Sequence, residues 1–300
     1  MFQSLPFIFL DSLVYASWLF LVASGLTLIY GVMKVLNIAH GSLYAFGAYS
    51  MAWLVGWFSS NYDNYQFLYF FFIPLSAILV AIILSLFIER IFLRKVYERD
   101  EIVIVLVTYG LFLIFEDIMK IIFGTTSYLP FQPRIMLGDI AVFGLPYVIY
   151  DLLIIVIAAL VWCLFFCIIK FTKIGKLLIA VIYDREIASS MGINVSKFFV
   201  YTFFTGCFLG CLGGATSAPM ISVVPGVGVE IIVLAFAVVV TGGLGSISGA
   251  LIGALLIGLF RTIAIFYFPQ FELFIVFFVM AIILTVKPEG LFGTKEVRKI

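Results

Sequence analysis

The chain has 300 residues, of which 65% are apolar and 11% charged, with a formal net charge of +1 and a mean hydropathy of +1.27. Soluble domains are nearer half apolar and a quarter charged, so these values exclude an ordinary soluble protein. The small net charge gives no reason to expect nucleic acid as a partner.

The apolar residues fall in runs of about 20, the length that crosses a bilayer as a helix. The runs are apolar on all sides, whereas strands of a membrane barrel alternate, so we predict helices. The first 30 residues lack a basic start and a cleavage site, and are expected to remain as a span. We therefore predict an all-α integral membrane protein: one domain over 1–300, a polytopic bundle of about 8–10 transmembrane helices with broken or re-entrant segments. The runs lie at about 7–31, 35–58, 67–88, 102–123, 147–169, 198–220, 230–241, 250–268 and 271–286.

Basic residues predict the orientation of these spans. Thirteen of the seventeen Lys and Arg lie in three segments, at 90–99, 170–197 and 287–299. Basic loops stay in the cytoplasm, so these segments and the C-terminus are expected inside and the N-terminus outside. Successive loops alternate between the two sides of the membrane without contradiction only if the short run 230–241 counts as a crossing.

The first unusual segment is 31–49, where polar residues and glycines interrupt an apolar run. Polar groups at membrane depth are costly and usually face the protein interior or a water-filled path. One interpretation is a substrate pathway, and the other is close helix packing with interhelical hydrogen bonds. The candidate pathway residues here are Asn37, His40, Gly41 and Ser42.

The second segment is the long cytoplasmic stretch at about 173–194. Residues 176–191 have the pattern of one amphipathic helix, ended by Gly192 where a left-handed turn is cheap. Asn194 or Ser196 then caps the next span. Such a helix suits a partner's groove, although a connector lying on the membrane surface is the alternative. The candidate contact residues are Asp184, Arg185, Glu186, Met191, Gly192 and Ile193.

The third segment is 241–258, which holds six glycines in eighteen residues. Two glycine-interrupted apolar segments, one in each half of the chain, indicate a broken-helix site near the midplane of a transporter. Tight packing without a ligand remains the alternative, because Gly249 and Gly253 form a G-x-x-x-G helix contact. The candidate pathway residues here are Gly243, Gly245, Ser246 and Gly249.

The remaining polar residues favour structural roles. Cys163/Cys167 and Cys207/Cys211 are each spaced i,i+4, which is better explained by packing than by a metal site. Glu116 and Lys120 have the same spacing and are interpreted as a neutralising pair. No G-x-x-x-x-G-K-[ST] phosphate loop or catalytic constellation occurs, so we expect neither an enzyme nor a cofactor in this chain.

Four runs of residues resemble branched-chain amino acid ABC transporter permeases of the Liv type. They are GLTLIYGVMKVLNIAHGSLYAFGAY at 25–49, DREIASSMGIN at 184–194, GGLGSISGALIG at 242–253 and KPEGLFG at 287–293. The resemblance implies a bacterial or archaeal cytoplasmic-membrane permease, with 184–194 as its ATPase-coupling loop. It also implies three partners: cytoplasmic ATPase subunits that bind ATP, a second identical or homologous permease, and an extracytoplasmic substrate-binding protein.

Two other functions stay open at this stage. Related permeases carry urea, amides or small organic acids, so the substrate is less defined than the type of transporter. An ion-coupled secondary transporter would also suit broken helices and buried acids. It would need neither ATPase nor binding-protein partners.

Overall fold

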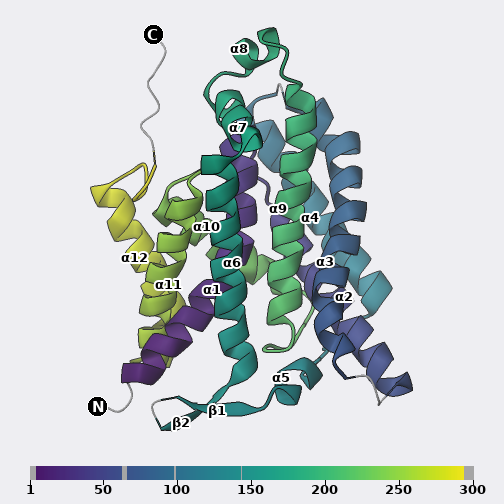
Figure 1. The fold of residues 1–300 in the computed structure, drawn as a ribbon, viewed down its shortest axis with the longest axis vertical. Helices are drawn as coiled ribbons and strands as arrows, with labels where there is room; N and C mark the ends of the chain where they lie inside the picture. The colour runs from purple at the N-terminus through teal and green to yellow at the C-terminus, as the bar shows by residue number, and fades with distance from the viewer. Residues whose placement is uncertain (1–4, 63–65, 98, 143, 294–300) are drawn as a thin grey trace.

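The computed structural model describes residues 5–62, 66–97, 99–142 and 144–293. These residues form twelve α-helices and one short two-stranded hairpin, which confirms an all-α membrane protein (Figure 1). The first six helices are α1 (Leu5–Met33), α2 (His40–Asn61), α3 (Leu68–Phe87), α4 (Glu101–Phe123), α5 (Gln132–Met136) and α6 (Ile149–Phe171). The others are α7 (Lys173–Tyr183), α8 (Arg185–Ser190), α9 (Val195–Ser217), α10 (Val227–Gly242), α11 (Ile247–Tyr267) and α12 (Glu272–Val286). Strands β1 (Asp139–Val142) and β2 (Leu145–Val148) pair antiparallel.

Each of the nine predicted apolar runs corresponds to one helix. Seven helices among the described residues are long and apolar enough to span a membrane: α1, α3 with its continuation to Lys95, α4, α6, α9, α11 and α12 with the turn before it. α10 is apolar but has only 16 residues. α2 begins at His40, five residues after the predicted start of its run, because 35–39 is not helical.

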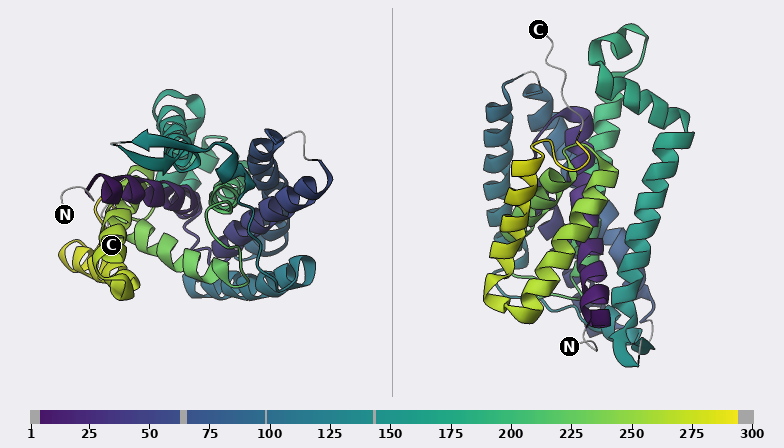
Figure 2. Two further views of the ribbon diagram at one scale, coloured as in Figure 1. Left: turned by 90° about the horizontal axis from the view of Figure 1, so that it is seen from below. Right: turned by 90° about the vertical axis from the view of Figure 1, so that its left-hand side faces the viewer.

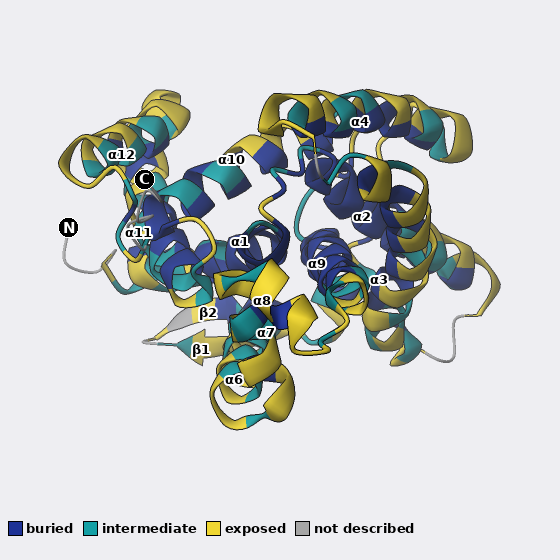
Figure 3. Ribbon diagram, turned by 90° about the horizontal axis from the view of Figure 1, so that it is seen from above, coloured by how far each residue is buried: buried dark blue, intermediate teal, exposed yellow. Residues whose placement is uncertain are grey.

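α1 and α9 lie at the centre of the bundle. α1 packs against α9 and α11, while α9 also packs against α2 and α3. Seen from above, these two helices are largely buried, and α4, α6 and α12 surround them with exposed residues (Figure 3). In lipid, helices associate through close backbone packing and not through a hydrophobic drive between them. Small residues at the α1–α9 crossing permit this, as where Gly25 faces Gly206.

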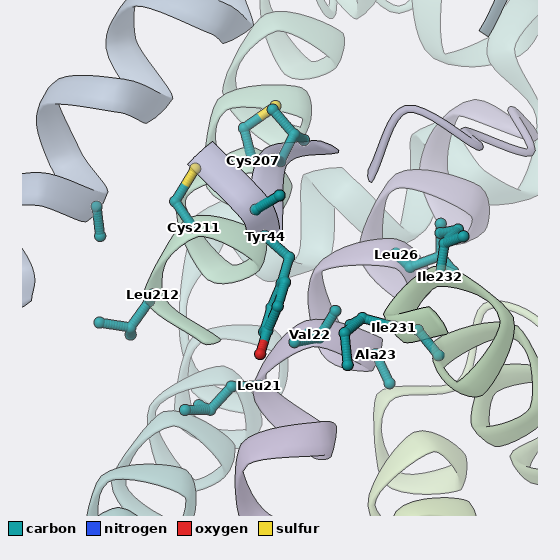
Figure 4. Packing of buried hydrophobic residues seen from close by; sticks show 14 of the residues in the cluster. Leu21, Val22, Ala23, Leu26, Tyr44, Cys207, Cys211, Leu212, Ile231 and Ile232 are labelled. Carbon is teal, nitrogen blue, oxygen red and sulfur yellow. The ribbon is translucent and has the colours of Figure 1, made fainter. Parts of the chain in front are cut away.

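Tyr44 of α2 fills the space between α1 and α9. It lies beside Cys207, Cys211 and Leu212 of α9 and points toward α1 (Figure 4), and it is fully buried. Its hydroxyl is 2.6 Å from Ser217 Oγ of α9. Burial of a phenol needs such a partner, so the aromatic ring and its hydrogen bond together fix α2 on α9.

The two ends of the bundle differ. The connection after α3, helices α7 and α8, and the segment after α12 share one end, while α5, the β-hairpin and the start of α1 share the other (Figures 1 and 2). We call these the α8 end and the hairpin end. The three basic segments of the sequence thus meet at the α8 end, as far as the described residues show. Lys295, Arg298 and Lys299 lie outside the described residues.

Two helices begin in the interior of the bundle. After Met33 the chain turns at Lys34, whose φ is +57°, and runs back so that His40 lies beside Val22 of α1. Val22 is eleven residues before the end of α1, so α2 begins about 16 Å from that end at 1.5 Å per residue. The start of α10 is equally internal, because Gly228 is in contact with Gly41.

Candidate functional site

The interior break before α2 holds three of the predicted pathway residues. Asn37, His40 and Ser42 are completely buried. His40 Nε2 lies 3.0 Å from the Val22 carbonyl oxygen. A carbonyl only accepts, so Nε2 carries the hydrogen. The Asn37 amide and His40 Nδ1 have no hydrogen-bond partner among the described residues. Unpartnered buried polar atoms cost stability, and three of those among the described residues lie at this break.

Thr108 of α4 satisfies the unwound backbone of this break. Its hydroxyl accepts from the Ile38 amide at 3.3 Å, and its one hydrogen is shared between the Leu36 carbonyl at 3.2 Å and the Val105 carbonyl of its own helix at 3.1 Å. Chain that leaves a helix inside a membrane needs such substitutes for its lost hydrogen bonds. The role of Thr108 is not visible in the sequence, because a single Thr within an apolar span carries no local signal.

We expect Thr108→Val to destabilise the protein, because valine keeps the shape but leaves the part-buried Ile38 amide unpaired and removes the hydroxyl hydrogen that the Leu36 carbonyl shares. An unpaired buried group costs about 1–3 kcal/mol, so the midpoint of thermal unfolding in detergent should fall clearly. Thr108→Ser keeps the hydroxyl and should unfold close to the parent temperature. Equal midpoints for the Val and Ser variants would show that the break is satisfied by other groups.

Gly41 allows α2 and α10 to meet at their N-termini. A Cβ at Gly41 would overlap the Gly228 carbonyl and lie 2.8 Å from Ile232. Glu116 of α4 closes the same junction: it is buried and interacts with the backbone of Gly226. A carboxylate is favourable beside a helix N-terminus. Four elements therefore converge here: α2, α4, α10 and the segment 218–226.

The predicted Glu116–Lys120 pair is not among the ion-pair contacts of the described residues, although Lys120 acts electrostatically on Glu116. Lys120 Nζ lies 3.0 Å from Asp117 instead, and both of those side chains are exposed. Helical spacing correctly places Glu116 and Lys120 on neighbouring turns. It does not show that Glu116 turns inward, toward the start of α10.

The glycine-rich candidates lie elsewhere, at the α8 end. Gly243 and Gly245 have φ of +108° and +83° and form the tight turn from α10 to α11, while Ser246 Oγ accepts from the Gly249 amide at 3.0 Å. Gly245 packs against Gly31 near the end of α1. The structure thus brings 243–249 beside the end of α1. The non-helical segment 34–39 lies between that end and His40. The role of 243–249 in a pathway stays a prediction.

The KPEGLFG segment explains the end of α10. Leu291 N donates to the Thr241 carbonyl at 2.9 Å, and Phe292 N donates to the Gly242 carbonyl at 2.8 Å. The last carbonyls of a helix have no partner within it. The segment after α12 therefore caps α10, and Gly243 is crowded against Gly293.

The predicted single helix 176–191 is wrong, because the chain breaks at Asp184. α7 ends at Tyr183, and the Asp184 carboxylate accepts from the amides of Glu186 and Ile187, each at 3.0 Å, to cap α8. Gly192 has the expected left-handed φ, +84°, and Ile193 N closes the C-terminal turn on Ala188. Asn194 caps α9 as predicted. Capping by Asp184 competes with continuing the helix.

α8 has an outer face and an inner contact. Tyr183 at the end of α7, Ile187 of α8 and Met191 directly after α8 are 85%, 60% and 77% exposed, and we call these three residues the α8 patch. Arg185 turns inward: its guanidinium donates to the Met33 carbonyl at 2.8 Å and to the Val32 carbonyl at 3.4 Å. It also stacks 4.9 Å above the Phe199 ring. Arg185 therefore joins α8 to the end of α1, directly before the interior break.

The cysteines are divided between two helices. Cys207 and Cys211 are buried within α9 and Cys163 and Cys167 are exposed on α6, and all four are free thiols. No group of three or more His, Cys, Asp or Glu side chains among the described residues has the geometry of a metal site.

Comparison with known proteins gives one consistent family. A family model described as "Branched-chain amino acid transport system / permease component" matches residues 8–286. The high-affinity branched-chain amino acid transport system permease protein LivH of Escherichia coli is 25% identical, with 93% of this chain and 92% of that protein covered. BraD of Pseudomonas aeruginosa, another permease protein of that description, is 24% identical, with 93% of each chain covered.

One solved structure has a similar fold. "PsaBC from Streptococcus pneumoniae in complex with Fab" superposes with a TM-score of 0.50 over 94% of this chain and 92% of its own. The sequence identity is 11%. At that identity the likeness concerns the fold alone.

Proposed function

The chain belongs to the family of branched-chain amino acid transport system permease components, and we propose that it is the membrane permease subunit of an ABC importer. It would carry branched-chain amino acids into the cytoplasm. The observation that carries this proposal is the family match across nearly all of the spans. ATP would be bound and hydrolysed by partner chains and not by this one.

The α8 patch supports an ATPase contact at the α8 end. Three large side chains, Tyr183, Ile187 and Met191, are exposed at the tip of the molecule, and exposed apolar groups of this kind mark contact surfaces. Arg185 connects this patch to α1. We assign the α8 end to the cytoplasm, because the basic segments meet there. The hairpin end would then face outward, toward a substrate-binding protein, and a second permease would complete the pathway.

Reconstitution tests this function directly. Proteoliposomes holding the chain with its ATPase and second permease should take up leucine only when ATP is present on the α8 side and a loaded binding protein on the other. Uptake driven by an ion gradient without ATPase would instead establish a secondary transporter. ATP-dependent uptake of urea or amides but not of leucine would change the substrate and keep the type of transporter.

The assigned orientation predicts a labelling pattern. On a background in which the four native cysteines are replaced, Asn61→Cys should react with an impermeant maleimide added to intact cells. Lys176→Cys, at the other end, should react only after the cells are made permeable. Both residues are exposed, so accessibility within the protein is matched. Labelling of Lys176→Cys in intact cells would reverse the orientation and remove the ATPase contact from α8.

A further inference from the structure

A cavity of about 560 Å³ lies toward the hairpin end, between α1, α10, α11 and the segment 218–226. Its volume is within the roughly 300–1,000 Å³ that small-molecule sites occupy. It shares lining residues, among them Arg134 and Met220, with a second cavity of about 560 Å³ beside α5 and β1. The two together connect the hairpin end with the start of α10.

Arg261 supplies a positive group on one wall. Its guanidinium lies 4.2 Å above the Tyr15 ring, and the ion pair to Glu272 is long, at 3.6 Å. Arg261 Nε has no hydrogen-bond partner among the described residues. The stacking holds the guanidinium plane in place. Because Nε is shut off from solvent and the side chain as a whole is 16% exposed, the terminal guanidinium nitrogens are the donors that can face the cavity. A planar fork of donors fits a carboxylate through two parallel hydrogen bonds.

Glu230 supplies a negative group in the first turn of α10 and lines the same cavity. Its side chain is exposed, and Glu230 is absent from the ion pairs found among the described residues. Both Glu230 and Arg261 act electrostatically on the Tyr15 hydroxyl, which therefore lies within range of both charges. Glu230 and Arg261 thus line one cavity without contacting each other, while Arg134, the third charged residue of its lining, is paired with Asp151.

The rest of the wall near these charges is apolar. Trp18, Ile231 and Leu234 line the cavity, and all three are buried. We infer that this cavity binds a zwitterionic α-amino acid with an apolar side chain: Arg261 takes the carboxylate, Glu230 the ammonium group, and Trp18, Ile231 and Leu234 the side chain. The inference rests on the proposed function and locates a substrate site within it, on the way from the hairpin end to the interior break.

Binding to the full chain in nanodiscs tests the site with three ligands of the same side chain. Leucine carries both charges, leucinamide lacks the carboxylate, and 4-methylpentanoate lacks the amino group. Competition against tritiated leucine should show both analogues at least about tenfold weaker, as expected for loss of one charged hydrogen-bond partner. Equal binding of all three, or no binding of leucine, would overturn the inference.

Two variants separate the charges. Arg261→Gln should weaken leucine about tenfold or more and leave leucinamide unchanged. Glu230→Gln should weaken leucine similarly and leave 4-methylpentanoate unchanged; because Glu230 is exposed, this variant tests the site even if Arg261→Gln misfolds. Asp117→Asn, an exposed acid outside the cavity, serves as the control with parent affinity. If neither variant weakens leucine, or if Glu230→Gln weakens all three ligands equally, the assignment is overturned.

Transport by the assembled importer distinguishes this inference from the proposed function. Loss of leucine uptake in Glu230→Gln with intact assembly supports the site. Parent rates in both variants overturn the site and leave the importer function standing. Absence of ATP-dependent amino acid uptake by the parent complex overturns the proposed amino acid substrate, and absence of ATP-dependent uptake of any substrate overturns the importer function itself, whatever the nanodisc binding shows.

Discussion

Replacing Gly214 by valine is expected to abolish the folded protein. Gly214 lies in α9 where α2 crosses it, and an added Cβ would overlap the Tyr44 carbonyl and lie 2.9 Å from Ala48 N. Both are backbone atoms, which cannot rotate away. The helices must separate, and the Tyr44–Ser217 hydrogen bond at the same crossing would be lost. Overpacking alone costs about 1–3 kcal/mol and sometimes more; the broken buried hydrogen bond adds about 1–3 kcal/mol.

Fluorescence-detected size-exclusion chromatography measures this effect. The Gly214→Val variant should give aggregate in place of the monodisperse peak. Gly56→Val is the matched control, because Gly56 is also a helix glycine and a Cβ there meets nothing within 4 Å. A monodisperse Gly214→Val protein with the thermal midpoint of the control would mean that α2 and α9 do not cross as closely as the structure shows.

The sequence predicts the spans of this protein well, because a run of about 20 apolar residues has few alternatives. It also predicts that 31–49 is interrupted, since Lys34, Asn37 and His40 cannot all face lipid. It does not predict where the chain goes after the interruption. That direction depends on Thr108 of α4 and Val22 of α1, which lie in other helices and carry no marker of their role.

The apolar runs leave a gap at 221–229, between α9 and α10, but they do not show that α10 begins in the interior of the bundle. The predicted run 198–220 extends three residues beyond Ser217, where α9 ends. Pro219, Pro225 and Gly226 follow, and these are loop signals, but the six glycines after Thr241 are denser. The dense glycines after Thr241 form a tight turn at the α8 end. The contact between the N-termini of α2 and α10 in the interior needs only one glycine from each helix, Gly41 and Gly228.

The charged residues of the cavity show a further limit. Glu230 and Arg261 are far apart in sequence and are brought to one wall only by the packing of α10 and α11 on α1. Each alone resembles a charge tolerated near the end of a span. Periodicity describes one helix at a time, so a site assembled from three helices leaves no pattern in any of them.

Arg185 carries the second large effect, which concerns transport and not folding. Its guanidinium satisfies carbonyls at the end of α1, which have no partner within that helix, and it connects them to α8. Arg185→Gln should leave the α8 patch unchanged, because Tyr183, Ile187 and Met191 are exposed on the outside. We therefore expect the ATPase to copurify in normal amount, while ATP-driven uptake falls about tenfold or more, the loss of one charged hydrogen-bonding group of about 1.5–3 kcal/mol.

The ratio of amino acid transported to ATP hydrolysed is the decisive measurement. It distinguishes a variant in which the ATPase binds but its hydrolysis no longer drives transport from a variant in which the ATPase does not bind. Ile187→Asp places a charge in the α8 patch and should lose the copurifying ATPase itself, whereas Arg185→Gln should keep the ATPase and lower only the ratio. Arg185→Lys retains one donor to the carbonyls but not the planar stack on Phe199, so its ratio should fall between those of the parent and the Gln variant. A normal ratio in Arg185→Gln would mean that α8 moves the spans through another contact. Loss of the ATPase in that variant would place Arg185 in the docking surface, and the link from α8 through Met33 to the interior break would no longer explain how hydrolysis reaches the centre of the bundle.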